Sequence, residues 1–334
     1  MDIFEWIEKQ LNPKVGNSAE FFYDEMDSQS GYSLPLIYHP FDASQRSHWR
    51  DRGSLFDFLF SVDGEGKRLL DFGPGDGWPS LIVAPFAKEV TGVDGSRRRV
   101  AVCTENARRM GISNARFIHV APGKPLPFPD STFDGVMAAT SVEQTPDPKE
   151  TLREFYRVLR PGGRLRIAYE ALAIYRDGQE REAQLDRIDD NTCRLILYDR
   201  HIDREYATMY RITFAVPSEK IAESLGQGGY PLPFDSITVP FLEEFYPSIT
   251  QTLVCSLTHP SGKTFVSWLK DIGFREIIPS HGGARFAGRL FDQLSEGERP
   301  GDIDAVDAIL RPLVKIVVRM PAPLDTDPML TAIK

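Results

Sequence analysis

Residues 70–77 read Leu-Asp-Phe-Gly-Pro-Gly-Asp-Gly, and this stretch decides the fold. It follows a short β-rich run and precedes an apolar helical segment. In an open α/β sheet the turn after the first strand lies at the edge where ligands bind, and glycines there allow a tight turn and a close approach of the backbone to a ligand. The dinucleotide fingerprint GxGxxG requires a glycine at position 78, where Trp78 stands. A pyrophosphate-binding turn is therefore a poor fit.

The segments around this turn alternate between β-rich runs and helices with one apolar stripe, which is typical of parallel α/β architecture. Asp147 is expected to cap a helix whose first residue is Pro148. The expected strands are 68–72, 90–94, 115–120, 133–139 and 164–169, and the expected helices are 78–87, 97–110 and 148–159. These units predict one doubly wound sheet.

The α/β pattern stops after residue 170 and returns at residue 263, so we expect an insertion between strands of the sheet. The returning part predicts a helix over 263–272, a sixth strand over 274–279 and a seventh over 313–320. The expected organisation is a helical lead-in or lid over 1–60, a core made of 61–170 and 263–334, and an inserted cap over 171–262.

The composition is that of a globular, enzyme-sized chain of 334 residues with a net charge of −9. An acidic surface repels phosphate backbones, so a nucleic-acid partner is not expected. Three cysteines without a CxxC spacing argue against disulfides and structural zinc, and indicate a reducing, cytoplasmic location. We also expect no signal peptide and no membrane span, because no apolar run approaches about 20 residues.

An acidic residue, Asp94, ends the second expected strand and is followed by Gly95. A carboxylate at this strand end can accept hydrogen bonds from both hydroxyls of a ribose, which selects a nucleoside without a 2′-phosphate. The competing interpretation is that Asp94 only caps the helix that follows. Together with the glycine turn, Asp94 predicts a nucleoside-containing ligand.

The region 68–170 resembles the class I S-adenosylmethionine-dependent methyltransferases, especially the small-molecule group that includes the ubiquinone and menaquinone methyltransferases. The resemblance rests on four stretches: 70–77, Val93-Asp94, 126–134 (LPFPDSTFD) and 154–163 (EFYRVLRPGG). It implies a Rossmann-like, seven-stranded, mostly parallel sheet, in which 313–320 would be the reversed final strand. It also implies S-adenosylmethionine as cofactor and S-adenosylhomocysteine as product.

The resemblance assigns cofactor-binding roles by position. Asp71 and the loop would bracket the methionine part, and Asp94 with Gly95 would hold the ribose. The loop over 120–125 lacks the acidic residue that usually binds adenine, so its backbone is the expected substitute. Thr140 and Ser141 follow the fourth strand, where the family lines the methyl group and the acceptor. The full expected set is Asp71, Gly73, Pro74, Gly75, Asp76, Gly77, Asp94, Gly95, Pro122, Gly123, Thr140 and Ser141.

The implied reaction is in-line transfer of a methyl group to a small-molecule acceptor, which needs alignment and exclusion of water but no metal. The catalytic residue stays unknown. His48 and Glu143 are the candidates, with an ordinary packed or surface histidine as the default interpretation of His48. Tyr23 and Tyr32 are further candidates for contact with cofactor or acceptor. The aromatic residues of 171–262 are expected to form an acceptor pocket, the insertion's own core or a homodimer interface.

Two other function classes remain open at this point. One is a nicotinamide-dependent oxidoreductase, which the early third glycine and the Pro-Gly-Gly at 161–163 disfavour. The other is a protein that binds S-adenosylmethionine without catalysing transfer, because the binding motif is clear whereas no catalytic residue is. The acceptor itself cannot be named from these residues.

Overall fold

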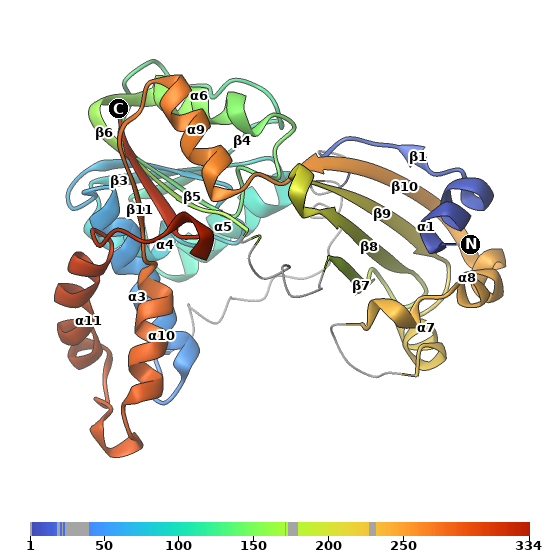
Figure 1. Cartoon of the computed structure of the whole chain (residues 1–334). Helices are drawn as coiled ribbons and strands as arrows, with labels where there is room; N and C mark the ends of the chain where they lie inside the picture. The colour runs from blue at the N-terminus through green and yellow to red at the C-terminus, as the bar shows by residue number, and fades with distance from the viewer. Residues whose placement is uncertain are drawn as a thin grey trace. The chain divides into compact units, whose positions relative to one another are not determined.

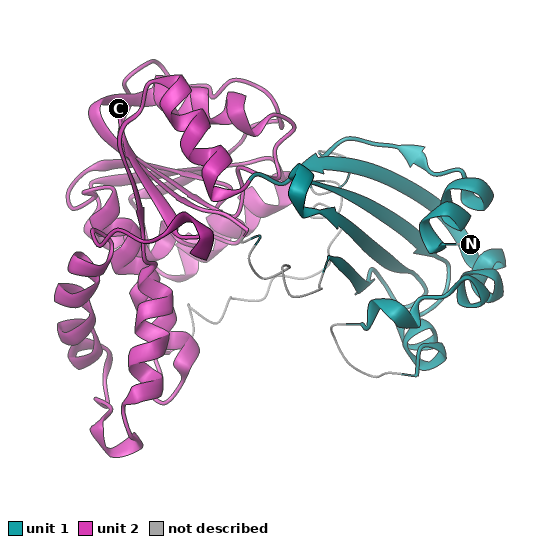
Figure 2. Cartoon of the chain, in the orientation of Figure 1, with its two compact units in different colours: residues 1–31, 172–260 teal, residues 32–171, 261–334 magenta. Residues whose placement is uncertain are grey.

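The protein is described by a computed structural model that covers residues 2–18, 21, 23, 40–170, 172, 180–226 and 232–334. The chain forms two compact units (Figure 1 and Figure 2). Unit 1 comprises residues 1–31 and 172–260, and unit 2 comprises residues 32–171 and 261–334. Each unit has its own sheet and its own hydrophobic core.

Unit 2 is built on one seven-stranded sheet. Its strands are β2 (Arg68–Phe72), β3 (Glu89–Asp94), β4 (Ala115–His119), β5 (Phe133–Ala139), β6 (Leu159–Ala168), β11 (Arg275–Ser280) and β12 (Met329–Ile333). Their order is β11-β12-β6-β5-β2-β3-β4, and only β12 runs antiparallel to its neighbours. This arrangement confirms the mostly parallel, Rossmann-like fold predicted from the sequence.

The helices of unit 2 follow the expected β-α alternation, with one exception near the glycine turn. The helix expected over 78–87 is only four residues long and continues as a 3-10 turn. The α-helices are α3 (Arg46–Ser61), α4 (Ser80–Val83), α5 (Arg97–Arg109), α6 (Pro148–Val158), α9 (Gly262–Ile272), α10 (Gly283–Gln293) and α11 (Ile303–Val317). The 3-10 turns are Ala84–Phe86, Glu296–Glu298 and Leu324–Thr326.

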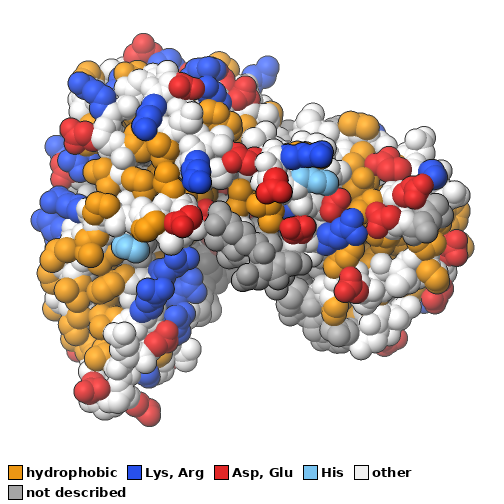
Figure 3. Space-filling model, viewed as in Figure 1, with side chains coloured by type: hydrophobic (Ala, Val, Ile, Leu, Met, Phe, Trp, Pro, Cys, Tyr) orange, Lys and Arg blue, Asp and Glu red, His pale blue; other side chains and the backbone are white. Residues whose placement is uncertain are grey.

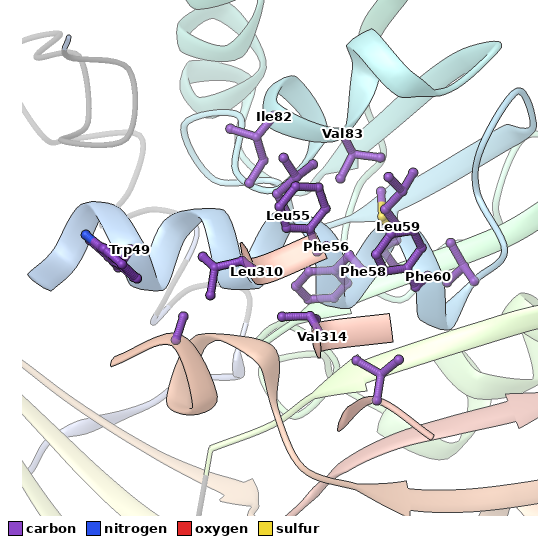
Figure 4. Packing of buried hydrophobic residues seen from close by; sticks show 14 of the residues in the cluster. Trp49, Leu55, Phe56, Phe58, Leu59, Phe60, Ile82, Val83, Leu310 and Val314 are labelled. Carbon is purple, nitrogen blue, oxygen red and sulfur yellow. The ribbon is translucent and has the colours of Figure 1, made fainter. Parts of the chain in front are cut away.

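Both faces of this sheet are covered, because successive residues of a strand point to opposite faces. On one face Leu69 and Met137 join the apolar cluster of α3, α4, α10 and α11. Figure 4 shows part of this cluster, where side chains of α3 lie beside Val83 of α4 and Val314 of α11. On the other face Leu70 packs with α6 and α9. The carboxyl ends of the strands are thereby held on a rigid core.

The strand expected over 313–320 is wrong, because these residues form the end of α11 and the turn after it. Leu310 and Val314 are buried against α3, whereas Leu313 is 37% exposed and Ile316 is 60% exposed. Apolar side chains thus occupy two neighbouring stripes of one helix, and in the linear sequence they imitate the alternation of a strand. The reversed final strand is β12.

The lead-in expected over 1–60 is not one segment. Residues 1–31 belong to unit 1, whereas α3 lies in the core of unit 2. Gly53 of α3 and Gly283 of α10 bring the two backbones into contact, because a Cβ on Gly53 would lie 2.4 Å from the Gly283 carbonyl oxygen. The apolar residues of α3 therefore serve the core, and the boundary expected at residue 60 is incorrect.

A buried ion pair joins α3 to the sheet. The guanidinium of Arg166 on β6 donates to both carboxylate oxygens of Asp57, at 2.8 and 3.0 Å. Arg166 also donates to the hydroxyls of Ser280 and Thr331. Both charged side chains are almost fully buried, and a buried pair is tolerated only when its remaining hydrogen bonds are satisfied. This network fixes α3, β6, β11 and β12 relative to one another.

Unit 1 contains a five-stranded sheet that the sequence analysis did not foresee. Its strands are β1 (Lys14–Val15), β7 (Arg181–Arg187), β8 (Cys193–His201), β9 (Tyr206–Phe214) and β10 (Ile249–Thr258). The order is β1-β10-β9-β8-β7, antiparallel except for the β1–β10 pair. The insertion is therefore completed by residues from the beginning of the chain.

Short helices cover one face of this sheet and build its core with residues such as Phe4, Leu197, Phe214 and Phe241. The aromatic residues of the insertion thus serve its own core, one of the alternatives expected from the sequence. The helices are α1 (Ile3–Trp6), continued by a π-helical turn (Ile7–Leu11), α7 (Ser218–Ser224) and α8 (Val239–Phe245), with 3-10 turns at Ile202–Arg204, Phe234–Ser236 and Tyr246–Ser248.

One exposed surface of unit 2 is unusually apolar. Ile309, Leu313, Ile316 and Met320 follow one another at helical spacing and are 36–60% exposed. Figure 3 shows the apolar side chains that gather over α11. Among the described residues, no helix combines the length and apolar character needed to cross a bilayer.

Candidate functional site

The glycine turn lies where the strand order of unit 2 reverses. From β2 the sheet extends through β3 and β4 on one side and through β5 and β6 on the other. Ligands of open α/β sheets bind outside the carboxyl ends of strands at such a switch point. The carboxyl ends of β2 and β3 and the loops after β2, β3, β4 and β5 carry all the expected cofactor-binding residues, so the fold brings them to one edge of the sheet.

Glycine is required at two positions of the turn for different reasons. Gly73 has a φ of +71°, and a Cβ there would lie 2.5 Å from the Cβ of Ser141. The Ser141 hydroxyl donates to the Phe72 carbonyl at 2.7 Å, so the ends of β2 and β5 meet at this point. Gly75 has a φ of +58°, and none of the described residues comes within 4 Å of its missing Cβ. Space therefore opens beside the backbone of Gly75.

Helix α5 anchors the outer part of the turn. The thiol of Cys103 donates to the Gly75 carbonyl at 3.1 Å, and the side-chain amide of Asn106 donates to the Asp76 carbonyl at 2.8 Å. Pro74 is buried, and its carbonyl accepts hydrogen bonds from the amides of Gly77 and Trp78. Burial raises the pKa of both Asp76 and Cys103. Hydrogen bonds from α5 and within the turn therefore fix the conformation of the loop.

Cys103 and Asn106 were missed as part of the site by sequence reasoning. In the sequence Cys103 stands at an apolar position of the helix expected over 97–110. Asn106 is 1% exposed, although it lies on a short helix rich in arginine. A buried amide on such a helix needs a hydrogen-bond partner. That polar residue on the buried face is the signal from which its role could have been found.

Asp94 closes the site on the β3 side. One carboxylate oxygen accepts from the Gly75 amide at 3.3 Å, and the other accepts from the Ser96 amide at 2.8 Å. The N-cap of α5 is Ser96, whose hydroxyl accepts from the Arg99 amide. Asp94 is therefore not the cap of this helix, and its carboxylate connects the β3 end to the glycine turn. The carbonyl of the next residue, Gly95, lies 3.0 Å from His119 Nε2.

Asp71 lies beneath the turn and is completely buried. One of its oxygens accepts hydrogen bonds from the amide and the hydroxyl of Ser80, at 2.9 and 2.6 Å. Its other oxygen is buried without a hydrogen-bond partner among the described residues. Burial, with a smaller contribution from the charge of Asp94, raises the pKa of Asp71 to about 7. The carboxyl group therefore fixes the start of α4 and keeps one unused acceptor atom.

The loops after β4 and β5 approach each other. Pro122 and Gly123 form a turn closed by the hydrogen bond from the Lys124 amide to the Ala121 carbonyl. Gly123 has a φ of +73°, and a Cβ there would lie 3.7 Å from Pro146. Thr140 is exposed and has a φ of +48°, which is unusual for a β-branched residue and marks local strain at the end of β5.

The two catalytic candidates lie in different surroundings. Glu143 follows the end of β5, and one of its oxygens accepts from the Glu170 amide at 2.7 Å. His48 lies on α3, where its Nδ1 accepts from the Asp42 amide at 2.8 Å and its ring lies 5.8 Å from that of Phe41. The described contacts of His48 belong to the start of α3 and do not connect it to the strand ends.

The other two candidates from the sequence, Tyr23 and Tyr32, stay predictions. Tyr23 belongs to unit 1, and Tyr32 lies outside the described residues. No group of three or more His, Cys, Asp or Glu side chains within the described ranges is placed to hold a metal ion. The strand-end residues therefore form the candidate site, with Glu143 as the catalytic candidate nearest to them in the fold.

Comparison with known proteins points to the same region. A family model described as "Methyltransferase domain" matches residues 70–167. The chain is 36% identical over 120 residues to the 27-O-demethylrifamycin SV methyltransferase of Amycolatopsis mediterranei, an alignment covering 36% of this chain and 44% of that relative. It is 32% identical over 139 residues to the phosphatidylethanolamine N-methyltransferase of Cereibacter sphaeroides, covering 38% and 67%.

A third relative is the ubiquinone/menaquinone biosynthesis C-methyltransferase UbiE of Geobacter sulfurreducens, which is 36% identical over 103 residues, covering 30% of this chain and 40% of that relative. The chain spans less than half the length of the first and third relatives but two thirds of the second. The matched residues contain the glycine turn, Asp94 and the β5 end. This chain belongs to the S-adenosylmethionine-dependent methyltransferases.

Proposed function

We propose that this protein transfers the methyl group of S-adenosylmethionine to a small-molecule acceptor. The observation that carries the proposal is the glycine turn at the switch point, with open space beside Gly75 and the carboxylate of Asp94 next to it. An acidic residue at the end of the second strand suits the ribose of a nucleoside, and the glycine turn beside it suits a polar group attached to that nucleoside. Membership of the methyltransferase family supports this cofactor.

The residues present fit the proposed cofactor. Asp94 and Gly95 would hold the ribose, while Asp71, Gly73, Pro74, Gly75, Asp76 and Gly77 would surround the methionine part. The unused buried oxygen of Asp71 offers an acceptor for a direct or water-mediated hydrogen bond. Pro122 and Gly123 would provide the adenine contact through their backbone, and Thr140 and Ser141 would border the reacting methyl group.

When bound, the cofactor supplies a methyl group on a positively charged sulfur. The chain's own residues then have two tasks, which are to hold the acceptor in line and to exclude water. The Cys103, Asn106 and Asp94 contacts support this alignment from the cofactor side, because they fix the backbone of the turn that would hold the cofactor. In-line displacement requires no metal for this purpose.

The acceptor does not carry over from the relatives. Their names describe an O-, an N- and a C-methyltransferase acting in different chemical settings. We propose that residues 172–260 supply much of the acceptor-binding surface, because the chain enters this insertion directly after β6, beside the strands of the site. The insertion is where this chain extends beyond the matched region.

A small acceptor in the cytoplasm is also supported by charge and cysteine chemistry. The net charge of −9 disfavours nucleic acid. All three cysteines are free and buried, as suits a reducing compartment. A homodimer is a further proposal, for which the exposed apolar stripe on α11 is the candidate interface.

Isothermal titration calorimetry with S-adenosylmethionine, S-adenosylhomocysteine and NADH tests the proposal. We expect both adenosyl compounds to bind and NADH not to bind. Binding of NADH alone would instead support a nicotinamide-dependent oxidoreductase. A screen with tritium-labelled methyl donor over phenols, amines and quinones then separates an enzyme from a protein that only binds the cofactor.

A further inference from the structure

Two buried polar side chains lie at the carboxyl ends of β5 and β6, and neither is used by the cofactor-binding residues. Glu143 is 6% exposed and Tyr169 is 9% exposed. β6 is the neighbour of β5, and β5 is the neighbour of β2, which carries the glycine turn. The two side chains therefore belong to the same edge as the cofactor site, on the side away from β3.

Each of these side chains has one atom that lacks a partner. Glu143 uses one oxygen to accept from the Glu170 amide, whereas its second oxygen is buried without a hydrogen bond among the described residues. The hydroxyl of Tyr169 is likewise buried and unbonded within that part of the chain. Leaving a buried polar group unsatisfied costs about 1–3 kcal/mol. Two such atoms at one sheet edge are available to bind a polar group of a ligand.

The surroundings of Tyr169 preserve room for its hydroxyl. A Cβ at Gly262, the first residue of α9, would lie 2.4 Å from this oxygen. The ring lies 5.1 Å from Phe265, so its position is set by packing on the apolar side of the sheet. Burial, with smaller contributions from the charges of Asp327 and Glu143, raises the pKa of the Tyr169 hydroxyl. Tyr169 therefore stays protonated and can donate a hydrogen bond.

We propose that Glu143 and Tyr169 bind the nucleophilic group of the acceptor, and that this group is a hydroxyl or an amine that carries a proton. The inference rests on the proposed function and narrows its substrate class. The second Glu143 oxygen accepts the proton of this group. The Tyr169 hydroxyl donates to one lone pair of a hydroxyl oxygen and leaves the other lone pair for the attack. On an amine it donates to the single nitrogen lone pair during binding and releases it before the attack.

The step balances without a further reactant. A lone pair of the acceptor's oxygen or nitrogen forms the new bond to the methyl carbon as the carbon–sulfur bond breaks, and that bond's electron pair stays on sulfur. The proton of the acceptor group passes to the Glu143 carboxylate. The positive charge of the sulfonium is thereby lost, and a neutral methylated acceptor, a neutral thioether and a protonated Glu143 result.

Glu143 has suitable properties for this role. Burial, with an added contribution from the nearby Glu170 charge, raises its pKa to about 7. A general base works best when its pKa lies near the working pH, because it is then available and still binds the proton well. The hydrogen bond from the Glu170 amide fixes one oxygen and leaves the second for the acceptor.

Binding of matched probe pairs to the full chain loaded with S-adenosylhomocysteine tests this inference. The pairs are para-nitrophenol with para-nitroanisole, and aniline with N,N-dimethylaniline, which differ by the O–H or N–H proton. We expect the proton-bearing member of at least one pair to bind about tenfold more tightly than its methylated counterpart, the scale of one hydrogen bond to a charged group. Calorimetry measures both affinities.

The variants are Glu143→Gln and Tyr169→Phe, with Glu150→Gln as the control. Glu150 carries the same charge in the same unit, and its side chain is 55% exposed. We expect both site variants to reduce the preference at least severalfold and to leave the affinity for S-adenosylhomocysteine unchanged, whereas the control keeps both properties. Thermal unfolding checks that each variant is folded. If Glu143→Gln does not fold, Tyr169→Phe still tests the inference.

The outcomes separate the two proposals. If the unmodified protein does not bind S-adenosylhomocysteine, the proposed function fails. If it binds this product but shows no preference in either pair, or keeps its preference in the folded variants, the inference about Glu143 and Tyr169 is overturned. A change of stability without a change of preference shows that the two groups hold only structural hydrogen bonds or water.

Discussion

Asp94 is the residue proposed to bind the ribose of the cofactor, and it lies beside the glycine turn. We predict that Asp94→Ala weakens the affinity for S-adenosylmethionine by about 1.5–3 kcal/mol, because the variant lacks the carboxylate that would accept charge-assisted hydrogen bonds from the ribose. Its removal also frees the amides of Gly75 and Ser96, so the loop itself becomes less fixed. Calorimetric titration of the variant measures the loss.

Asp130→Ala is a suitable control for this experiment, because Asp130 is a surface carboxylate of the same unit with 77% exposure. Asp94→Asn keeps one acceptor oxygen and is expected to lose less affinity than the alanine variant. An unchanged affinity in Asp94→Ala would mean that the carboxylate serves only the Gly75 and Ser96 amides.

The buried carboxyl groups Asp71 and Glu143 make stability depend on pH. Burial raises the pKa of each to about 7 in the folded state, whereas in the unfolded chain such groups titrate near 4. Between these values the folded state binds more protons, so stability falls as the pH rises from about 4 to about 7 and then levels off. We predict that the urea midpoint decreases over this range.

The variant Asp71→Asn tests the origin of this slope. Its side-chain oxygen can still accept from Ser80, but it no longer titrates, so the decrease between about pH 4 and pH 7 should become shallower. Glu143→Gln should make the decrease of stability over this pH range shallower as well. A slope identical to that of the unmodified protein in both variants would assign the pH dependence to other groups.

At the scale of secondary-structure elements, local chemistry decided what could be predicted. Asp147 caps α6 through the Glu150 amide, as expected. Helix α9 ends at Ile272, where the expected helix ends, and the next residue is Gly273 with a φ of +109°. The sheet of unit 1 could not be predicted, because its strands contain buried charges such as Arg211, which is 4% exposed and lies over the ring of Phe21. In the linear sequence such residues resemble a solvated segment, and only pairing between distant strands buries them.

In the candidate site, too, some residues could be predicted from local spacing and others depend on tertiary packing. The loop glycines and Asp94 stand in a recognisable local spacing, whereas Cys103 and Asn106 reach the loop from a helix whose orientation depends on tertiary packing. The contact between Tyr169 and Gly262 is still harder to predict, since the two residues lie far apart in the sequence and come together only in the folded structure. Spacing reveals residues that act within one turn, but not those that support it from elsewhere.

The crossing of α3 and α10 provides a prediction about packing. A Cβ at Gly53 would lie 2.4 Å from the backbone oxygen of Gly283, a contact that flexible side chains cannot relieve. We predict that Gly53→Ala lowers the free energy of unfolding by about 1–3 kcal/mol, the usual cost of overpacking a core. Chemical denaturation measures the change. Gly297→Ala is the control, because the described structure leaves open space around that position, and equal stability of the two variants would contradict the close crossing.

At the scale of the whole molecule, the apolar stripe on α11 tests the proposed homodimer. A contiguous exposed apolar patch commonly marks an interface, and Ile316 is its most exposed member. If this stripe joins two copies, light scattering should show a dimer that Ile316→Glu converts to a monomer. Ala308→Glu adds the same charge to an exposed position elsewhere on α11 and should leave the dimer intact. A monomeric unmodified protein would remove the proposal.

The division into two units predicts that cofactor binding and acceptor binding can be separated. The chain leaves and re-enters unit 2 at neighbouring points, because the Tyr169 hydroxyl lies beside Gly262. A short Gly-Ser linker can therefore replace residues 172–260, and residues 1–31, which belong to unit 1, can be removed with them. All the proposed cofactor-binding residues stay in unit 2.

We predict that this shortened protein binds S-adenosylhomocysteine with an affinity close to that of the full chain but transfers no methyl group, because it lacks the proposed acceptor surface. Circular dichroism establishes whether it is folded, and Asp94→Ala in the same background should weaken its binding as in the full chain. A folded protein without affinity would place part of the cofactor site in unit 1. A protein that still methylates the acceptor of the full chain would place acceptor recognition within unit 2, where Glu143 and Tyr169 already provide its polar contacts.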